Sequence, residues 1–186
     1  MGLFSSVKGL FSDKLLEEIS AAYGLTPQVT VHRMGHNASS RRWTGLVLNL
    51  PVLLEPALDH SWYVTVGDLG ENEGEEDSVI LERFDPSEPG NEMVRDEEID
   101  GPLALAGPAV VEQYLIGGEP DSGDYSVLKH PAVGRILPSF SAAVEMVNLY
   151  FNRHAVMINL KREGLDRATF DRDLALAVEL SKALGG

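Results

Sequence analysis

The sequence contains no cysteine and no long apolar run, and these absences exclude several classes of protein. Without cysteine the chain has no disulfide, no thiolate metal site and no cysteine nucleophile. Its longest apolar run, residues 46–54, is interrupted by Asn49 and Pro51 and is far shorter than the roughly 20 residues of a membrane span. Lys8 breaks the apolar stretch that a secretory signal would need. We therefore expect a soluble, cytoplasmic protein.

Basic residues are also scarce. The chain has 15 Lys and Arg residues against 29 Asp and Glu residues, which gives a formal net charge of −14. Fourteen of the acidic residues lie within residues 68–100, where Arg83 and Arg95 are the only basic residues. Such a charge repels phosphate groups, which argues against nucleic-acid binding. A protein partner of the 68–100 region is expected to be basic.

Hydrophobic periodicity predicts strands where apolar residues alternate and helices where they recur every three or four residues. Strands are expected at residues 28–32, 43–50, 62–66 and 79–84, with a short edge strand at 102–106 and a hairpin of 147–151 with 155–160. Helices are expected at residues 3–23, 108–116, 131–144 and 169–184, the third with a kink at Pro138. The inner stripe of the last helix is Phe170, Leu174, Ala177, Val178, Ser181 and Leu184.

The order of these elements predicts an α+β fold. Most connections between strands are too short for crossovers, so the sheet should be largely antiparallel. We expect one domain over residues 1–186, with a sheet of about five to seven strands and N-terminal and C-terminal helices packed on it. Residues 68–100 are expected to be an acidic, loop-rich region of that domain.

The predicted N-terminal helix, residues 1–23, carries the candidate interaction site. Large apolar side chains gather on one face of its first half: Leu3, Phe4, Val7, Leu10 and Phe11. This pattern is typical of a helix that lies on a membrane surface or binds a partner. It is equally typical of a terminal helix that packs on its own domain. Burial of the two leucines and two phenylalanines contributes on the order of 6–12 kcal/mol in each setting. The size of this free energy therefore does not decide between the two interpretations.

Other candidate sites have weaker patterns. His32 and His36 are four residues apart at the end of a strand, and His60 lies at another strand edge, but surface histidines explain these positions. The acidic run 71–77 lacks the ligand spacing of a calcium loop. His130 and His154 are expected to face solvent. We therefore expect no metal and no cofactor.

The sequence favours a non-catalytic adaptor over an enzyme, because it carries none of the nucleophile, phosphate-binding or zinc motifs of common enzymes. The adaptor would bind a protein partner, or lie at the periphery of a membrane, through the amphipathic helix and the acidic surface. The alternative is a small-molecule-binding or hydrolytic domain with a pocket between the sheet and the C-terminal helix. An apolar cavity with convergent polar groups would favour that alternative.

Overall fold

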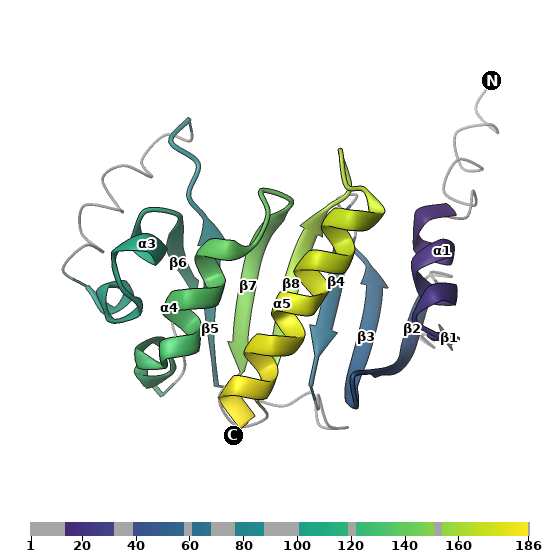
Figure 1. Cartoon of the computed structure of the whole chain (residues 1–186), viewed down its shortest axis with the longest axis horizontal. Coiled ribbons are helices and arrows are strands. Elements are labelled where there is room, and N and C mark those ends of the chain that lie inside the picture. Colours follow the sequence, from purple (N-terminus) through teal and green to yellow (C-terminus); the bar gives the residue numbers. More distant parts are fainter. Residues whose placement is uncertain are drawn as a thin grey trace.

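A computed structural model describes residues 14–31, 39–57, 61–67, 77–87, 101–118, 122–150 and 154–185. It confirms the predicted class, because the chain forms an α+β fold on an antiparallel sheet (Figure 1). The sheet has eight strands in the order β1-β2-β3-β4-β8-β7-β5-β6, slightly more than expected. The strands are β1 (Thr26–Val31), β2 (Ser39–Val47), β3 (Leu50–Pro56), β4 (Ser61–Val66), β5 (Ser78–Arg83), β6 (Tyr114–Gly118), β7 (Val144–Tyr150) and β8 (Ala155–Lys161).

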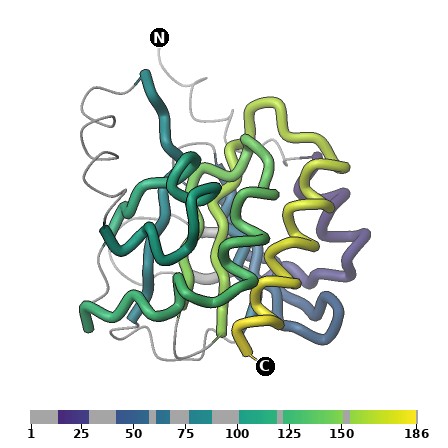
Figure 2. The backbone as a smooth tube through the Cα atoms, turned by 60° about the vertical axis from the view of Figure 1, so that its left-hand side comes forward, coloured from purple at the N-terminus to yellow at the C-terminus, as the bar shows by residue number. Residues whose placement is uncertain are grey.

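The larger helices lie on one face of this sheet. The α-helices are α1 (Lys14–Ala22), α3 (Pro108–Val111), α4 (Pro131–Ile136) and α5 (Arg167–Gly185), and the 3₁₀ helices are η2 (Pro102–Ala106), η3 (Ser126–Lys129) and η4 (Leu137–Ser139). In Figure 1, α1, α4 and α5 all lie in front of the strands, and Figure 2 shows α4 and α5 side by side. Within the described part of the chain, no helix is long and apolar enough to cross a membrane.

The core lies between α5 and the middle of the sheet. Alternate residues of β4 and β8 point toward α5 and are almost completely buried: Trp62, Val64, Val66, Val156, Ile158 and Leu160. The predicted stripe of α5 faces them. Its first five members are buried and Leu184 is half-buried, so the stripe is confirmed except at its end. Side chains therefore fill the described interface between the sheet and α5.

The segment 102–106 is the 3₁₀ helix η2 and not the edge strand predicted from its alternating leucines and alanines. Leu103 and Ala106 are buried, whereas Leu105 remains 44% exposed. Residues three apart share a face in a 3₁₀ helix, which accounts for this pattern of burial. Pro102 at the first turn favours the helical start.

The helix predicted at 108–116 is correct only in its first turn. Helix α3 ends at Val111, and the following residues form β6, which pairs with β5. The aromatic and aliphatic residues 114–116 suit a strand. Gly117 therefore belongs to strand β6 and does not end a helix. A Cβ at this position would lie 2.5 Å from the Glu82 side chain on the neighbouring strand.

The strand predicted at 43–50 contains parts of two strands. β2 ends at Val47, and β3 begins at Leu50 and includes Pro51 and Pro56. The helix predicted at 131–144 ends earlier, because α4 gives way to η4 at Pro138 and to β7 at Val144. Glu145 therefore lies in β7, where it pairs with Lys161 at 3.3 Å, and not at a helix end. The predicted hairpin is confirmed as β7–β8.

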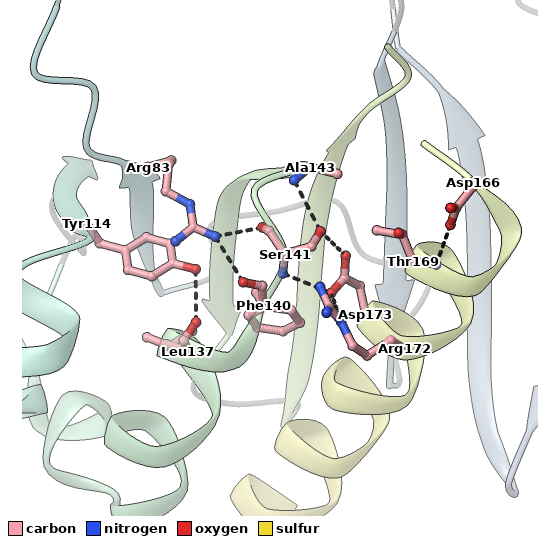
Figure 3. A network of polar contacts seen from close by, with 10 residues as sticks. All are labelled: Arg83, Tyr114, Leu137, Phe140, Ser141, Ala143, Asp166, Thr169, Arg172 and Asp173. Carbon is pink, nitrogen blue, oxygen red and sulfur yellow. Dashed lines mark hydrogen bonds and ion pairs between the residues drawn. The ribbon is translucent and has the colours of Figure 1, made fainter. Parts of the chain in front are cut away.

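A buried polar network joins the α4 side of the sheet to α5 (Figure 3). Asp173 of α5 is completely buried and accepts hydrogen bonds from the backbone N–H and the hydroxyl of Ser141. The Ser141 carbonyl in turn accepts from Arg83 at 2.7 Å. The Arg83 guanidinium lies 4.7 Å from the centre of the Tyr114 ring, and the Tyr114 hydroxyl donates to the Leu137 carbonyl. The network thus fixes α5 against the start of β7.

Replacement of Asp173 by alanine should lower the free energy of unfolding by about 1–3 kcal/mol, because it leaves two donors of the half-buried Ser141 without their acceptor. Asp173→Asn keeps a carbonyl oxygen and should lose less. Urea denaturation measures both. The control is Arg172→Ala, because Arg172 is exposed and 3.6 Å from Asp173, so that its loss should cost less than about 1 kcal/mol. Equal stability of Asp173→Ala and wild type would show that the network does not hold α5.

Burial makes the protein sensitive to alkali at Tyr114. Desolvation raises the pKa of Tyr114 from 10.0 to about 12. The unfolded chain therefore loses this proton at a lower pH than the folded chain, and the free energy of unfolding should fall as pH rises from about 10 to about 12. Urea denaturation of wild type and Tyr114→Phe through this range checks the effect. The variant, which cannot ionise, should lose less stability; parallel pH profiles would contradict the assignment.

Candidate docking groove

The turn between β2 and β3 presents two leucines to solvent. Val47 pairs with Leu50, so the loop consists of Leu48 and Asn49 alone. Both residues have positive φ angles, +50° and +68°, as the short hairpin turn that matches strand twist requires. Leu48 is 65% exposed and Leu46 on the adjoining strand is 67% exposed. These are the two most exposed large apolar side chains in the described part of the chain.

Beside this turn lies an apolar groove between α1 and α5. Its volume is about 370 Å³. The lining residues come from the end of α1, the β2–β3 turn and the middle of α5: Ala22, Tyr23, Leu46, Val47, Leu48, Asp171, Leu174, Ala175 and Val178. On α5, Leu174 and Val178 belong to the buried stripe, so the accessible part of this wall comes from exposed Ala175 and half-buried Asp171. The exposed leucines thus continue an apolar surface into the groove.

Tyr23 ties the two helical walls together. Its ring lies 6.4 Å from the ring of Phe170, and its hydroxyl donates to Asp171 at 2.9 Å. Asp171 also accepts from Arg167 at 2.6 Å, and the Arg167 guanidinium lies over the Tyr23 ring. Burial, and then the bond to Asp171, raises the pKa of Tyr23. The charges at this rim are therefore paired with each other, and the groove itself remains apolar.

The sequence determines the wall that α1 forms. Leu16 and Ile19 repeat at helical spacing and are buried against the core. The chain then turns at Gly24, and Leu25 packs over β2 at Gly45, where a Cβ would lie 2.8 Å from the Leu25 side chain. A residue larger than glycine at position 45 would force the Leu25 side chain to shift.

A second hollow lies at the opposite end of α5. It has a volume of about 430 Å³ and brings together residues from η3, α4, β7, the β7–β8 turn and α5: Ser126, Val127, Lys129, His130, Pro131, Tyr150, His154 and Leu184. His154 is exposed as expected, whereas His130 is half-buried. The Nδ1 atom of His130 accepts from the Ala132 N–H and caps α4. His130 therefore has a structural role here.

The predicted interaction residues Leu3, Phe4, Val7, Leu10 and Phe11 lie outside the described residues, so their role stays a prediction. The same holds for His32, His36 and His60 and for most of the acidic run 71–77. Among the residues that the structure does describe, no three histidine, aspartate or glutamate side chains gather as metal ligands would.

Sequence reasoning missed the exposed leucines because it assigned Leu46 and Leu48 to a covered strand. A signal was present, since Asn49 interrupts the apolar run at the point where the two strands meet. Asparagine tolerates a positive φ and is common in two-residue hairpin loops. A hairpin centred on Asn49 would have placed Leu48 at its tip.

Comparison with known proteins supports the fold. No protein-family model and no curated protein sequence matches the chain. A solved structure, the crystal structure of the mycobacterial trehalose monomycolate transport factor A, TtfA, resembles it with a TM-score of 0.53 over 92% of this chain and 93% of that chain. The two sequences are 9% identical, so the likeness is one of fold.

Replacement of Tyr23 by phenylalanine should lower the free energy of unfolding by about 0.5–1.5 kcal/mol, because it removes the hydrogen bond to Asp171 but keeps the ring packed on Phe170. Urea denaturation provides the measurement. Lys14→Ala is the control, since its ion pair with Glu18 lies at the surface and should contribute little. A Tyr23→Phe variant as stable as wild type would show that the hydroxyl does not tie α1 to α5.

Proposed function

We propose that this protein is a non-catalytic adaptor that binds an apolar helix of a protein partner in the groove between α1 and α5. The observation that carries the proposal is the conformation and exposure of Leu48. A bulky residue at positive φ is disfavoured by about 1–2 kcal/mol, and exposure to water adds no compensating burial. A leucine at this position does not stabilise the fold, but it would provide an apolar contact to a docked partner.

The shape of the groove favours a helical occupant. Its walls are the end of α1 and one face of α5, and the β2–β3 turn lies beside them. An amphipathic helix places apolar residues at positions i, i+3, i+4 and i+7, which suits an apolar groove of this kind. Leu48 at the rim would contact the exposed side of such a helix. A central apolar anchor surrounded by polar pairs, such as Tyr23–Asp171, is the usual anatomy of a protein interface.

Two further features belong to the proposal. The N-terminal residues Leu3, Phe4, Val7, Leu10 and Phe11 offer a second apolar contact element on the same chain, directly before α1. The acidic region 68–100 favours a basic partner, because opposite charges accelerate association. The mycobacterial protein of similar fold is a transport factor, and a role of that kind is compatible with an adaptor.

The alternative of a pocket between the sheet and α5 has less support. Among the described residues, the side chains that face each other across this interface are packed in one buried cluster. The groove lies at the edge of α5 and not beneath it, and its charged lining residue, Asp171, is already engaged by Tyr23 and Arg167. We therefore favour a docking surface over a catalytic or small-molecule site.

The variant Leu48→Asn tests the proposal without damage to the fold. Asparagine suits the positive φ at this position, so the variant should be at least as stable as wild type. The loss of this apolar contact should weaken partner binding about tenfold or more. The partner is captured from the native cell with wild-type protein, identified and purified, and its dissociation constants with both proteins are measured by calorimetry.

The matched control is Leu105→Asn, since Leu105 is also an exposed leucine but lies on η2, away from the groove. This control should bind the partner as wild type does. Equal affinity of Leu48→Asn and wild type would refute docking at the groove. If the protein sediments with lipid vesicles, and deletion of residues 2–12 abolishes this sedimentation while Leu48→Asn does not change it, the protein would instead be assigned to a membrane surface.

A further inference from the structure

The second hollow, at the end of α5 that is marked C in Figure 1, has a lining unlike the rest of this acidic chain. Three of its eight lining residues are basic, namely Lys129, His130 and His154, and none of the eight is acidic. In the whole sequence, by contrast, 29 acidic residues outnumber 15 Lys and Arg residues. We propose that this hollow binds a small organic carboxylate, a molecule with one carboxylate group on an apolar body.

His130 offers a defined hydrogen-bond donor to such a ligand. Its Nδ1 atom accepts a hydrogen bond from the Ala132 N–H at 3.2 Å. In the neutral ring the proton therefore lies on Nε2. Because Nδ1 is occupied, Nε2–H is the group that this half-buried ring can still offer to a ligand in the hollow. The contact that caps α4 thus also fixes the tautomer of the donor.

Lys129 supplies the positive charge. It is exposed and forms no ion pair with any residue of the described ranges. The acidic residue nearest to it in sequence, Asp124, lies outside the lining and accepts two hydrogen bonds from Ser126. A bound anion would therefore be the counterion of Lys129. One lysine matches the single charge of a carboxylate better than the charge of about −1.5 to −2 on a phosphate group.

The exposed His154 ring reaches the hollow from a backbone position that α5 holds in place. Its φ angle is +51°, a conformation that is uncommon for residues other than glycine. The hydroxyl of the buried Ser181 on α5 donates to the His154 carbonyl at 2.7 Å. A Cβ at Gly185 would lie 3.3 Å from the His154 Cβ. The end of α5 therefore fixes the turn that presents this imidazole to the hollow.

The rest of the lining suits an apolar ligand body. Val127, Pro131 and Leu184 contribute aliphatic side chains, and the half-buried Tyr150 contributes an aromatic ring. The volume of about 430 Å³ lies within the range of roughly 300–1,000 Å³ that is typical of small-molecule sites. Apolar walls with a few polar groups that fix orientation are the usual composition of such sites. The hollow does not share its lining with the docking groove, so this inference does not depend on the proposed adaptor function.

An NMR titration of the full-length protein with phenylpropionate tests the site, because this probe has one carboxylate and a compact apolar body. The signals of residues around the hollow should shift, and the shifts give the dissociation constant. The amide of the probe keeps its shape but lacks the charge. It should bind at least about tenfold more weakly, since hydrogen bonds to a charged group are roughly twice as strong as neutral ones. Equal affinity of acid and amide, or no shift with millimolar phenylpropionate, would overturn the inference.

Two substitutions should weaken the binding of phenylpropionate. Lys129→Gln removes the charge, and His154→Asn removes the imidazole with a residue that tolerates the positive φ. Each should raise the dissociation constant about fivefold or more. Both side chains are exposed, so the variants should fold, which thermal denaturation checks. The matched control is Lys14→Gln, an exposed lysine on α1 away from the hollow, which should bind the probe as wild type does.

The variants also locate the probe. If Lys129→Gln and His154→Asn bind phenylpropionate as tightly as wild type, the probe does not occupy this hollow and the inference is wrong. If Leu48→Asn weakens its binding instead, the probe lies in the docking groove, and the inference is again wrong. Neither outcome changes the effect of Leu48→Asn on the affinity for the protein partner, so failure here and failure of the proposed function are distinguishable.

Discussion

Phe170 packs edge-to-face against Trp62 of β4, with ring centres 6.3 Å apart, and at a tilt against Tyr23 at the end of α1, with ring centres 6.4 Å apart. These two aromatic contacts join the sheet, α5 and α1. An edge-to-face pair such as Phe170–Trp62 contributes about 0.5–1.5 kcal/mol beyond its buried area. Because both walls of the groove are positioned through Phe170, the groove depends on the same packing that holds the core together.

The two sides of α5 are attached by different forces. Toward α4 and β7, the buried carboxylate of Asp173 holds Ser141, and Glu179 pairs with Arg135 at 2.6 Å. Toward α1, the described contacts are those of Tyr23, which packs on Phe170, lies beneath the Arg167 guanidinium and donates a hydrogen bond to Asp171. Directional hydrogen bonds fix one geometry. Asp173 therefore holds the α4 side of α5 from a buried position, whereas Tyr23 holds the α1 side from the rim of the proposed docking groove.

Strong hydrophobic periodicity explains which elements could be predicted from the sequence. The stripe of α5 and the β7–β8 hairpin repeat at 3.6 and 2 residues over enough length that local pattern and burial agree. The failures arose where one local signal has two meanings. Pro51 and Pro56 lie near the ends of β3, where a missing N–H is tolerated. Leucine and alanine alternate over residues 103–106, as in a strand, but the two buried residues are Leu103 and Ala106, which are three apart as in a 3₁₀ helix. The groove could not be predicted, because its walls come from three distant segments.

Leu48 is the position where local preference and fold disagree, and such positions in natural proteins tend to be functional. A tight turn selects asparagine or glycine at positive φ, and an exposed site selects polar side chains, so two independent pressures oppose leucine at this position. The net charge of −14 opposes the association of two molecules through this apolar patch. The proposed docking groove would account for Leu48, because a partner helix in it would bury this side chain.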